Sequence, residues 1–206
     1  MNFVGIDLEG VLVPEIWIAL AKKTGIEELK LTTRDIEKYS DLMQIRIAVL
    51  KKNNIRAAEL FSIASDIEPL EGAKNFLQEL RSAYQVIVLS DTFYNLSKPI
   101  FKKLNFPSVF CHKLLIDADG MISGMKKCAD NHKMQTIQYM QKLNFYTIAI
   151  GDSYNDINML KKADSGILFR TTEEIAKKFP NFFICNSFDE LKVKIDKTFN
   201  SIQENI

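Results

Sequence analysis

The sequence predicts an α/β protein whose core is a doubly wound, Rossmann-like parallel sheet, with a small all-helical cap inserted in it and one β-hairpin. Short apolar runs recur along the chain, and strands that are apolar on both faces are typical of parallel sheets covered by helices. Amphipathic helical patterns separate these runs, so strand and helix alternate. The runs are 3–6, 86–89, 147–150, 166–169 and 182–185.

The cap follows the first strand. Between Pro14 and about Glu68 no convincing strand is found, and Pro69 marks the return to the core. Helices are expected over 16–23, 33–51 and 57–65. The predicted domains are therefore a core of residues 1–13 and 69–206 and a helical cap of residues 14–68.

The hairpin is predicted from a turn between two apolar segments. Leu114 to Ile116 is followed by the turn dipeptide Asp119-Gly120 and then by Met121 and Ile122. Such a dipeptide between apolar residues is a strong local signal for two antiparallel strands.

Composition excludes several classes of protein. The 206 residues are 47% hydrophobic and carry 27 Lys and Arg against 26 Asp and Glu, which argues against a disordered chain and a strongly basic nucleic-acid binder. No apolar run is long enough to cross a bilayer, and the start of the chain lacks the features of a signal peptide. Cys111, Cys128 and Cys185 have no metal-binding spacing. We expect a cytoplasmic protein with neither nucleic-acid nor membrane partners; its oligomeric state, a homodimer included, stays open.

Polar side chains gather where the predicted strands end. In open α/β sheets ligands bind at the carboxyl ends of the strands. Taken singly, these side chains are ordinary turn formers, helix caps or solvated residues. Together they concentrate carboxylates beside a hydroxyl and a lysine, which is costly unless a cation and an anion bind there. They are Asp7 and Glu9, Ser90 and Asp91, Lys133, and Asp152, Asn155 and Asp156.

Oxygen ligands without His or Cys favour a hard cation. Mg²⁺ commonly joins one or two carboxylates to a phosphate, so a phosphate ester is the expected substrate. A carboxylate in such a site can attack phosphorus and form an aspartyl-phosphate, which divides one difficult transfer into two easier steps.

These motifs, in this order, resemble those of the haloacid dehalogenase-like hydrolases. The helical insertion is similar to the cap of the phosphoserine phosphatases. The segment from Asp7 to Trp17 resembles a bacterial branch of that family that also transfers the phosphoryl group to homoserine. The resemblance implies a Mg²⁺-dependent phosphoserine phosphatase of serine biosynthesis, with phosphotransfer to homoserine as the alternative.

The resemblance also implies a role for each site residue. Asp7 would be the nucleophile and a metal ligand, and Glu9 the general acid and base, with its main-chain oxygen on the metal. Asp152 and Asp156 would complete the metal site. Lys133 would offset the charge of Asp7 and the phosphate. The remaining expected contacts are Ser90, Asp91 and Asn155 with the phosphate, and Glu15 and Arg46 with the ammonium and carboxylate of the substrate.

Two positions depart from the usual family pattern. Glu9 stands where an aspartate is usual, and Val11 where a threonine is usual. Trp17 and Phe93 are assigned to packing, and His112 and His132 receive no role.

Other classes of function remain. A signalling receiver phosphorylated on Asp7 without rapid turnover is one, although a receiver needs neither a cap nor the late Gly151 to Asp156 motif. An inactive binding module is another. A dinucleotide-binding module is disfavoured, because no G-x-G-x-x-G follows the first strand.

Overall fold

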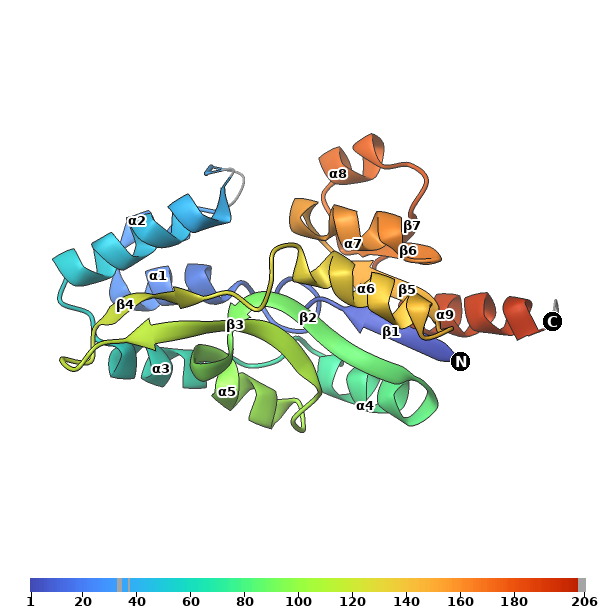
Figure 1. Cartoon of the computed structure of the whole chain (residues 1–206), viewed down its shortest axis with the longest axis horizontal. Helices are drawn as coiled ribbons and strands as arrows, with labels where there is room; N and C mark the ends of the chain where they lie inside the picture. The colour runs from blue at the N-terminus through green and yellow to red at the C-terminus, as the bar shows by residue number, and fades with distance from the viewer. Residues whose placement is uncertain (33–34, 37, 204–206) are drawn as a thin grey trace.

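The computed structural model, which describes residues 1–32, 35–36 and 38–203, contains one seven-stranded sheet between two layers of helices (Figure 1). The strand order is β4-β3-β2-β1-β5-β6-β7, and all neighbouring strands are parallel except β3 and β4. The doubly wound α/β fold is thus confirmed. The strands are β1 (Asn2–Ile6), β2 (Gln85–Phe93), β3 (Val109–Ile116), β4 (Ile122–Lys126), β5 (Tyr146–Gly151), β6 (Ser165–Phe169) and β7 (Phe183–Cys185).

The central strand, β1, is where the winding reverses. It pairs with β2 on one side and with β5 on the other. The carboxyl ends of these three strands therefore lie side by side, at the type of crevice in which doubly wound proteins bind ligands.

Alternate residues of the strands pack on opposite helical layers. Val4 and Ile6 belong to one buried cluster with α4, α5 and α9, whereas Phe3 belongs to another with α6, α7 and α8. The apolar spacing of Phe76, Leu77 and Leu80 explains why α4 lies on the sheet. The helices are α4 (Ala73–Ala83), α5 (Tyr94–Lys103), α6 (His132–Lys142), α7 (Ile157–Lys162), α8 (Glu173–Lys178) and α9 (Phe188–Gln203).

The named elements between β1 and α4 are all helices. They lie at the opposite end of the molecule from both termini (Figure 1). The segment contains α1 (Ile16–Thr24), the short 3-10 helix η1 (Glu27–Lys30), α2 (Tyr39–Lys52) and α3 (Ala57–Ser65). Its side chains join the buried cluster of the sheet, since Trp17, Leu20 and Leu60 share it with Val4. The domain boundaries remain a prediction.

One predicted helix begins later than expected. The pattern over 33–51 predicts a helix from Thr33, but α2 starts at Tyr39, and Asp35 and Ile36 lie in a turn and a bend. The Oδ2 atom of Asp35 accepts hydrogen bonds from both N and Oγ1 of Thr32, and such local bonds compete with helix formation. Residues 33, 34 and 37 of the predicted helix lie outside the described residues.

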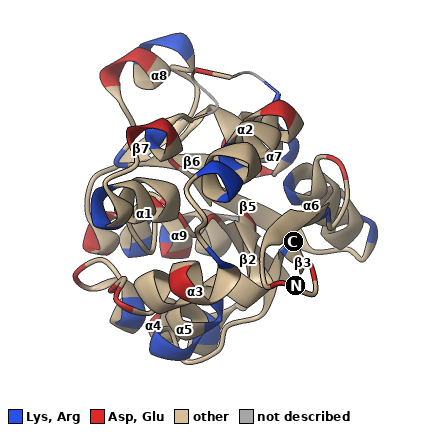
Figure 2. Ribbon diagram, turned by 90° about the vertical axis from the view of Figure 1, so that its left-hand side faces the viewer, with Lys and Arg blue, Asp and Glu red and all other residues tan. Residues whose placement is uncertain are grey.

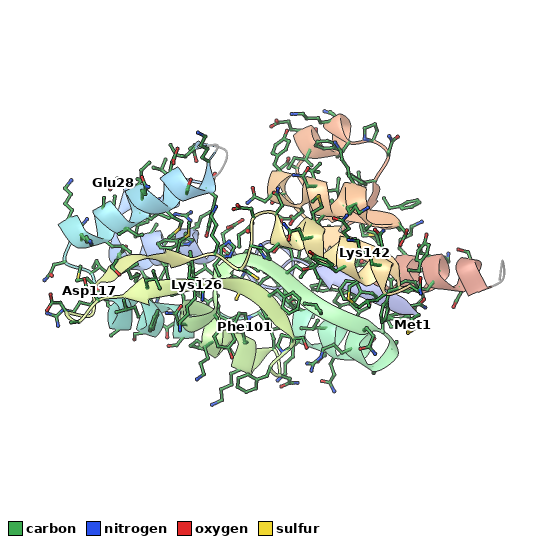
Figure 3. All side chains as sticks on the ribbon, in the orientation of Figure 1. Met1, Glu28, Phe101, Asp117, Lys126 and Lys142 are labelled. Atoms are coloured by element: carbon green, nitrogen blue, oxygen red, sulfur yellow. The ribbon has the colours of Figure 1, made fainter. Side chains whose placement is uncertain are left out.

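The predicted hairpin is present as β3 and β4. Oδ1 of Asp117, labelled in Figure 3 at the tip, accepts the amides of Asp119 and Met121. The tip touches the helical segment, because Ala57 N donates to Gly120 O at 2.9 Å. The first half of β3, which pairs in parallel with β2, was not predicted from the sequence.

Charges of both signs are interspersed over the helices (Figure 2), in keeping with the net charge of +1. Within the described part of the chain, every helix is too short or too polar to cross a membrane.

Candidate active site

The carboxyl ends of β1 and β5 bring three predicted carboxylates together. Asp7 follows β1, and Asp152 follows β5, with Asp156 in the 3-10 turn η2 (Tyr154–Asp156) just beyond. Each offers an oxygen within 4.8 Å of the others. The convergence predicted from the sequence is therefore found for these side chains.

Ser90 and Asp91 reach the same place through an irregularity in β2. The apolar run 86–89 predicts that they follow the strand, but β2 continues to Phe93. Between Leu89 and Phe93 the register with β3 shifts, since Leu89 pairs with Phe110 and Phe93 with His112. Residues in a β-bulge leave the regular ladder, so Ser90 and Asp91 can face the crevice from within a strand.

A tight turn after Asp7 brings the main chain against Asp152. Leu8 N donates to Oδ1 of Asp7 at 2.7 Å, and Val13 N donates to Leu8 O at 3.0 Å. Gly10 has a φ of 77°, and a Cβ atom there would collide with the Asp152 carboxylate. This position therefore requires glycine both for its conformation and for its close approach.

Lys133, near the start of α6, is the cation at the centre of the carboxylates. Its Nζ lies 2.9 Å from Oδ1 of Asp7, 2.9 Å from Oδ1 of Asp156 and 3.7 Å from Oδ2 of Asp91. Burial alone would lower the pKa of Lys133, but Asp156, Asp7 and Asp91 raise it well above its usual value. Lys133 is therefore charged.

Asp156 is fully buried and organises the loop after β5. Its Oδ2 accepts the amides of Asp152 and Ser153 at 3.1 and 3.2 Å, and its Oδ1 accepts from Lys133. A Cβ atom at Gly151 would collide with this side chain. With both oxygens engaged, Asp156 holds Lys133 and the Asp152 loop in place.

Glu9 is anchored at the start of α1. Its Oε2 accepts the amide of Ile16 at 2.9 Å, which satisfies a donor at the helix start. Burial, followed by the charge of Glu15, raises the pKa of Glu9 from 4.5 to about 8. The carboxyl is thus mainly protonated at neutral pH and can give a proton to a leaving group.

The electrostatics of the acidic group suit a divalent cation. Burial and the neighbouring Asp156 raise the pKa of Asp7, despite the opposing effect of Lys133. Burial and Asp156 also raise the pKa of Asp152 to about 7. A cation on these oxygens would relieve the repulsion, and an all-oxygen donor set fits Mg²⁺.

A cavity of about 340 Å³ joins the acidic group to the helical segment. It includes every predicted site residue except the deeply buried Asp156, and Glu15 and Arg46 line it together with Asp7. Trp17, assigned to packing, is buried but lines the cavity as well. The residues of the sequence prediction found there are Asp7, Glu9, Glu15, Arg46, Ser90, Asp91, Lys133, Asp152 and Asn155.

Arg46 presents a buried guanidinium to this cavity. It is 5% exposed, its Cζ atom lies 4.4 Å from the centre of the Trp17 ring, and its Nη2 donates to Leu31 O at 2.8 Å. Its Nε is buried without a hydrogen-bond partner among the described residues. Such an orphaned donor is costly, and a carboxylate ligand would satisfy it.

Three residues of the site escaped the sequence analysis. Tyr39, at the start of α2, donates from its hydroxyl to Asp91 O at 2.7 Å and so ties the helical segment to β2. His132 Nε2 lies 3.1 Å from Ser90 O, and His112 Nε2 lies 3.5 Å from Asp91 Oδ1. These contacts span many residues of sequence, and no local pattern signals them.

Comparison with known proteins agrees with this geometry. Residues 4–164 match the haloacid dehalogenase-like hydrolase family. A protein named phosphoserine phosphatase from Pseudomonas syringae pv. tomato is 44% identical over 95% of this chain and 82% of its own. Phosphoserine phosphatase ThrH of Pseudomonas aeruginosa is 43% identical over 93% of this chain and 94% of its own.

A solved structure shares the architecture. A crystal structure of phosphoserine phosphatase in its apo form is 26% identical, with a TM-score of 0.73 over 89% of this chain and 92% of that one. Motifs, fold and the match over residues 4–164 agree, and the chain belongs to the haloacid dehalogenase-like hydrolases.

Proposed function

We propose that the protein is a Mg²⁺-dependent phosphoserine phosphatase, which converts O-phospho-L-serine and water to L-serine and phosphate through an aspartyl-phosphate on Asp7. The observation that carries this proposal is the buried guanidinium of Arg46, with an orphaned Nε, in the same cavity as Asp7 and Lys133. In a small phosphate ester that bears a carboxylate, the carboxylate can pair with Arg46 while the phosphate lies beside Asp7 and Lys133. The names of the two Pseudomonas relatives agree with this choice.

The first step uses Asp7 and Glu9. A carboxylate oxygen of Asp7 attacks phosphorus, and the bond between phosphorus and the serine oxygen breaks. Glu9, whose pKa is raised to about 8, gives its proton to that oxygen. When bound by Asp7, Asp152, Asp156 and the main-chain oxygen of Glu9, Mg²⁺ would supply charge neutralisation at the phosphoryl group.

The second step returns the enzyme to its starting state. Glu9, now ionised, takes a proton from a water molecule, whose oxygen attacks the phosphorus of the aspartyl-phosphate. The bond to Asp7 breaks, and phosphate leaves. Glu9 therefore acts as an acid in the first step and as a base in the second.

The phosphate would be held by Ser90, Lys133 and Asn155, all of which line the cavity. Asp91 would act on it indirectly. Its carboxylate faces Lys133, His112 and His132 and so positions the lysine rather than touching an anion.

Residues 14–68 would act as the cap that closes over the amino acid. Glu15 would receive the substrate ammonium and Arg46 its carboxylate. Closure would keep bulk water away in the first step and admit the acceptor in the second.

Homoserine as the acceptor is the second candidate. It is favoured by the segment from Asp7 to Trp17, in which Glu9 and Val11 replace the usual residues of ordinary phosphoserine phosphatases. Homoserine would then take the place of water and leave as phosphohomoserine.

One assay tests both candidates. Phosphate release from a panel of small phosphate esters is measured with Mg²⁺, with and without homoserine, and phosphohomoserine is sought by mass spectrometry. Phosphoserine should be the preferred donor, and the Asp7→Asn variant should release no phosphate. Turnover by a pure Asp7→Asn preparation would contradict the covalent mechanism, and a stable phosphorylated Asp7 without released phosphate would indicate a receiver.

A further inference from the structure

A second group of metal-ligand side chains lies beside the acidic one. Asp91, His112 and His132 each offer an atom within 4.8 Å of the others. The chain has only two histidines, and both are here, with ring centroids 4.9 Å apart. Both rings are buried. The proposed phosphatase mechanism uses neither of them.

The spacing of the three atoms suits a tetrahedral transition metal. Oδ1 of Asp91 lies 3.5 Å from Nε2 of His112 and 3.8 Å from Nδ1 of His132. Ligands about 2.0 Å from a tetrahedral Zn²⁺ are separated from one another by about 3.3 Å. The two distances to Asp91 exceed this value by about 0.2 and 0.5 Å, and all three ligand atoms lie within 4.8 Å of one another, so modest side-chain movements would bring them onto a metal.

The hydrogen-bond partner of His132 determines which of its ring nitrogens is free to bind a metal. Its Nε2 lies 3.1 Å from Ser90 O, a carbonyl that can only accept, so Nε2 carries the hydrogen. A neutral imidazole carries a single ring hydrogen, so Nδ1 is then unprotonated and offers its lone pair. Nδ1 and the Asp91 carboxylate are thus two acceptors facing each other, an arrangement that a cation between them would stabilise.

His112 would have to change tautomer to bind the same metal. Its Nδ1 accepts the amide of Cys128 at 3.1 Å, which places the hydrogen on Nε2, toward Asp91. Metal binding at Nε2 moves this hydrogen to Nδ1 and breaks the bond from Cys128. Cys128 is exposed and lies in a bend between β4 and α6, outside the regular strands and helices.

A metal ion can reach the group from solvent. Asp91, His112 and His132 line a cavity of about 620 Å³ beside α6, next to the one that holds Asp7. A workable metal site needs such a path of entry.

We propose that Asp91, His112 and His132 bind a transition-metal ion such as Zn²⁺, at a site separate from the one proposed for Mg²⁺. Two imidazole nitrogens favour Zn²⁺ over Mg²⁺, whereas the all-oxygen group at Asp7 has the opposite preference. The two sites are linked through Lys133, since its Nζ lies 3.7 Å from Oδ2 of Asp91 and 2.9 Å from Oδ1 of Asp7. A metal on Asp91 would compete with Lys133 for that carboxylate.

Calorimetric titration of the full chain with Zn²⁺, in a large excess of Mg²⁺, tests the proposal. We expect one equivalent of Zn²⁺ to bind despite the Mg²⁺, and His132→Gln to weaken it by about tenfold or more. Cys128→Ser and Asp130→Asn are matched controls, because Cys128 is a neighbouring thiol and Asp130 an exposed carboxylate on the same cavity. Neither should change the affinity.

A measurement on the unaltered protein guards against misfolding of the variant. Nitrogen-15 NMR of the two histidine rings, recorded with Mg²⁺ before and after one equivalent of Zn²⁺, should show large shifts for Nδ1 of His132 and Nε2 of His112. Unshifted ring nitrogens, Zn²⁺ binding that excess Mg²⁺ abolishes, or equal affinity in a folded His132→Gln variant would each overturn the proposal.

Discussion

The Nζ atom of Lys133 lies 2.9 Å from Oδ1 of Asp7, and both side chains are only 7% exposed. The same Nζ pairs with Asp156, so one buried cation compensates two buried carboxylates. Removing one partner of a buried ion pair leaves an uncompensated charge, which costs more than the pair itself contributes. The stability of the metal-free protein should therefore depend on Lys133.

Replacement of Lys133 by Met should lower the free energy of unfolding of the metal-free protein by about 3 kcal/mol, because Asp7 and Asp156 lose their cation. Mg²⁺ should restore part of this loss. Urea unfolding with and without Mg²⁺ measures both effects. Lys74→Met, on the exposed face of α4, is the matched control and should change stability by about 0.5 kcal/mol or less. Equal losses in the two variants would contradict the pairing argument.

The pH dependence of the free energy of unfolding of the metal-free protein should show whether Glu9 is protonated. Burial and Glu15 raise the pKa of Glu9 from 4.5 to about 8, so the folded protein binds a proton that the unfolded chain releases. The resulting stability is complete below the unfolded pKa and is lost as the pH rises through the folded pKa. The free energy of unfolding should therefore fall from about pH 5 to pH 8, and less steeply in Glu9→Gln. Glu59→Gln, exposed on α3, should retain the wild-type slope. Parallel profiles for wild type and Glu9→Gln would show that Glu9 is ionised in the folded protein.

Local sequence patterns were sufficient to predict most of the fold and the acidic part of the site. The apolar runs ending near Asp7 and Asp152 identify buried strands, and a parallel sheet brings their carboxyl ends together. Residue types then indicate the chemistry. Where a side chain follows directly from the strand that carries it, sequence and topology are enough.

The features that were missed depend on contacts between distant segments. The bulge at Ser90 arises from the pairing of β2 with β3, and β3 was recognised only in part. Asp91 meets His112 and His132 because β2, β3 and the start of α6 pack together. Two isolated histidines form no periodic sequence pattern, so their contact can be recognised only in the structure.

Arg46 should distinguish substrates by their carboxylate. Arg46→Lys keeps a positive charge but loses the planar fork that pairs with a carboxylate. We expect KM for phosphoserine to rise about tenfold or more, with little change for phosphoethanolamine, which has the ammonium and phosphate but lacks the carboxylate. Steady-state kinetics with both esters measure this difference. A similar rise in KM for both esters would show that Arg46 stabilises the cavity but does not bind the substrate carboxylate.

Gly10 and Gly120 form a natural pair for testing the turn beside Asp152. Both have positive φ, 77° and 80°, so alanine should destabilise either by about 1 kcal/mol through backbone strain. Only at Gly10 does the added Cβ collide with the Asp152 carboxylate; at Gly120 nothing lies within 4 Å. Gly10→Ala should therefore raise the Mg²⁺ concentration needed for half-maximal activity about tenfold or more, whereas Gly120→Ala should leave it unchanged. Titration of phosphatase activity with Mg²⁺, alongside thermal unfolding of both variants, separates strain from displacement of Asp152. Because the strain is common to the two variants, wild-type Mg²⁺ dependence in Gly10→Ala would mean that Asp152 does not bind the metal.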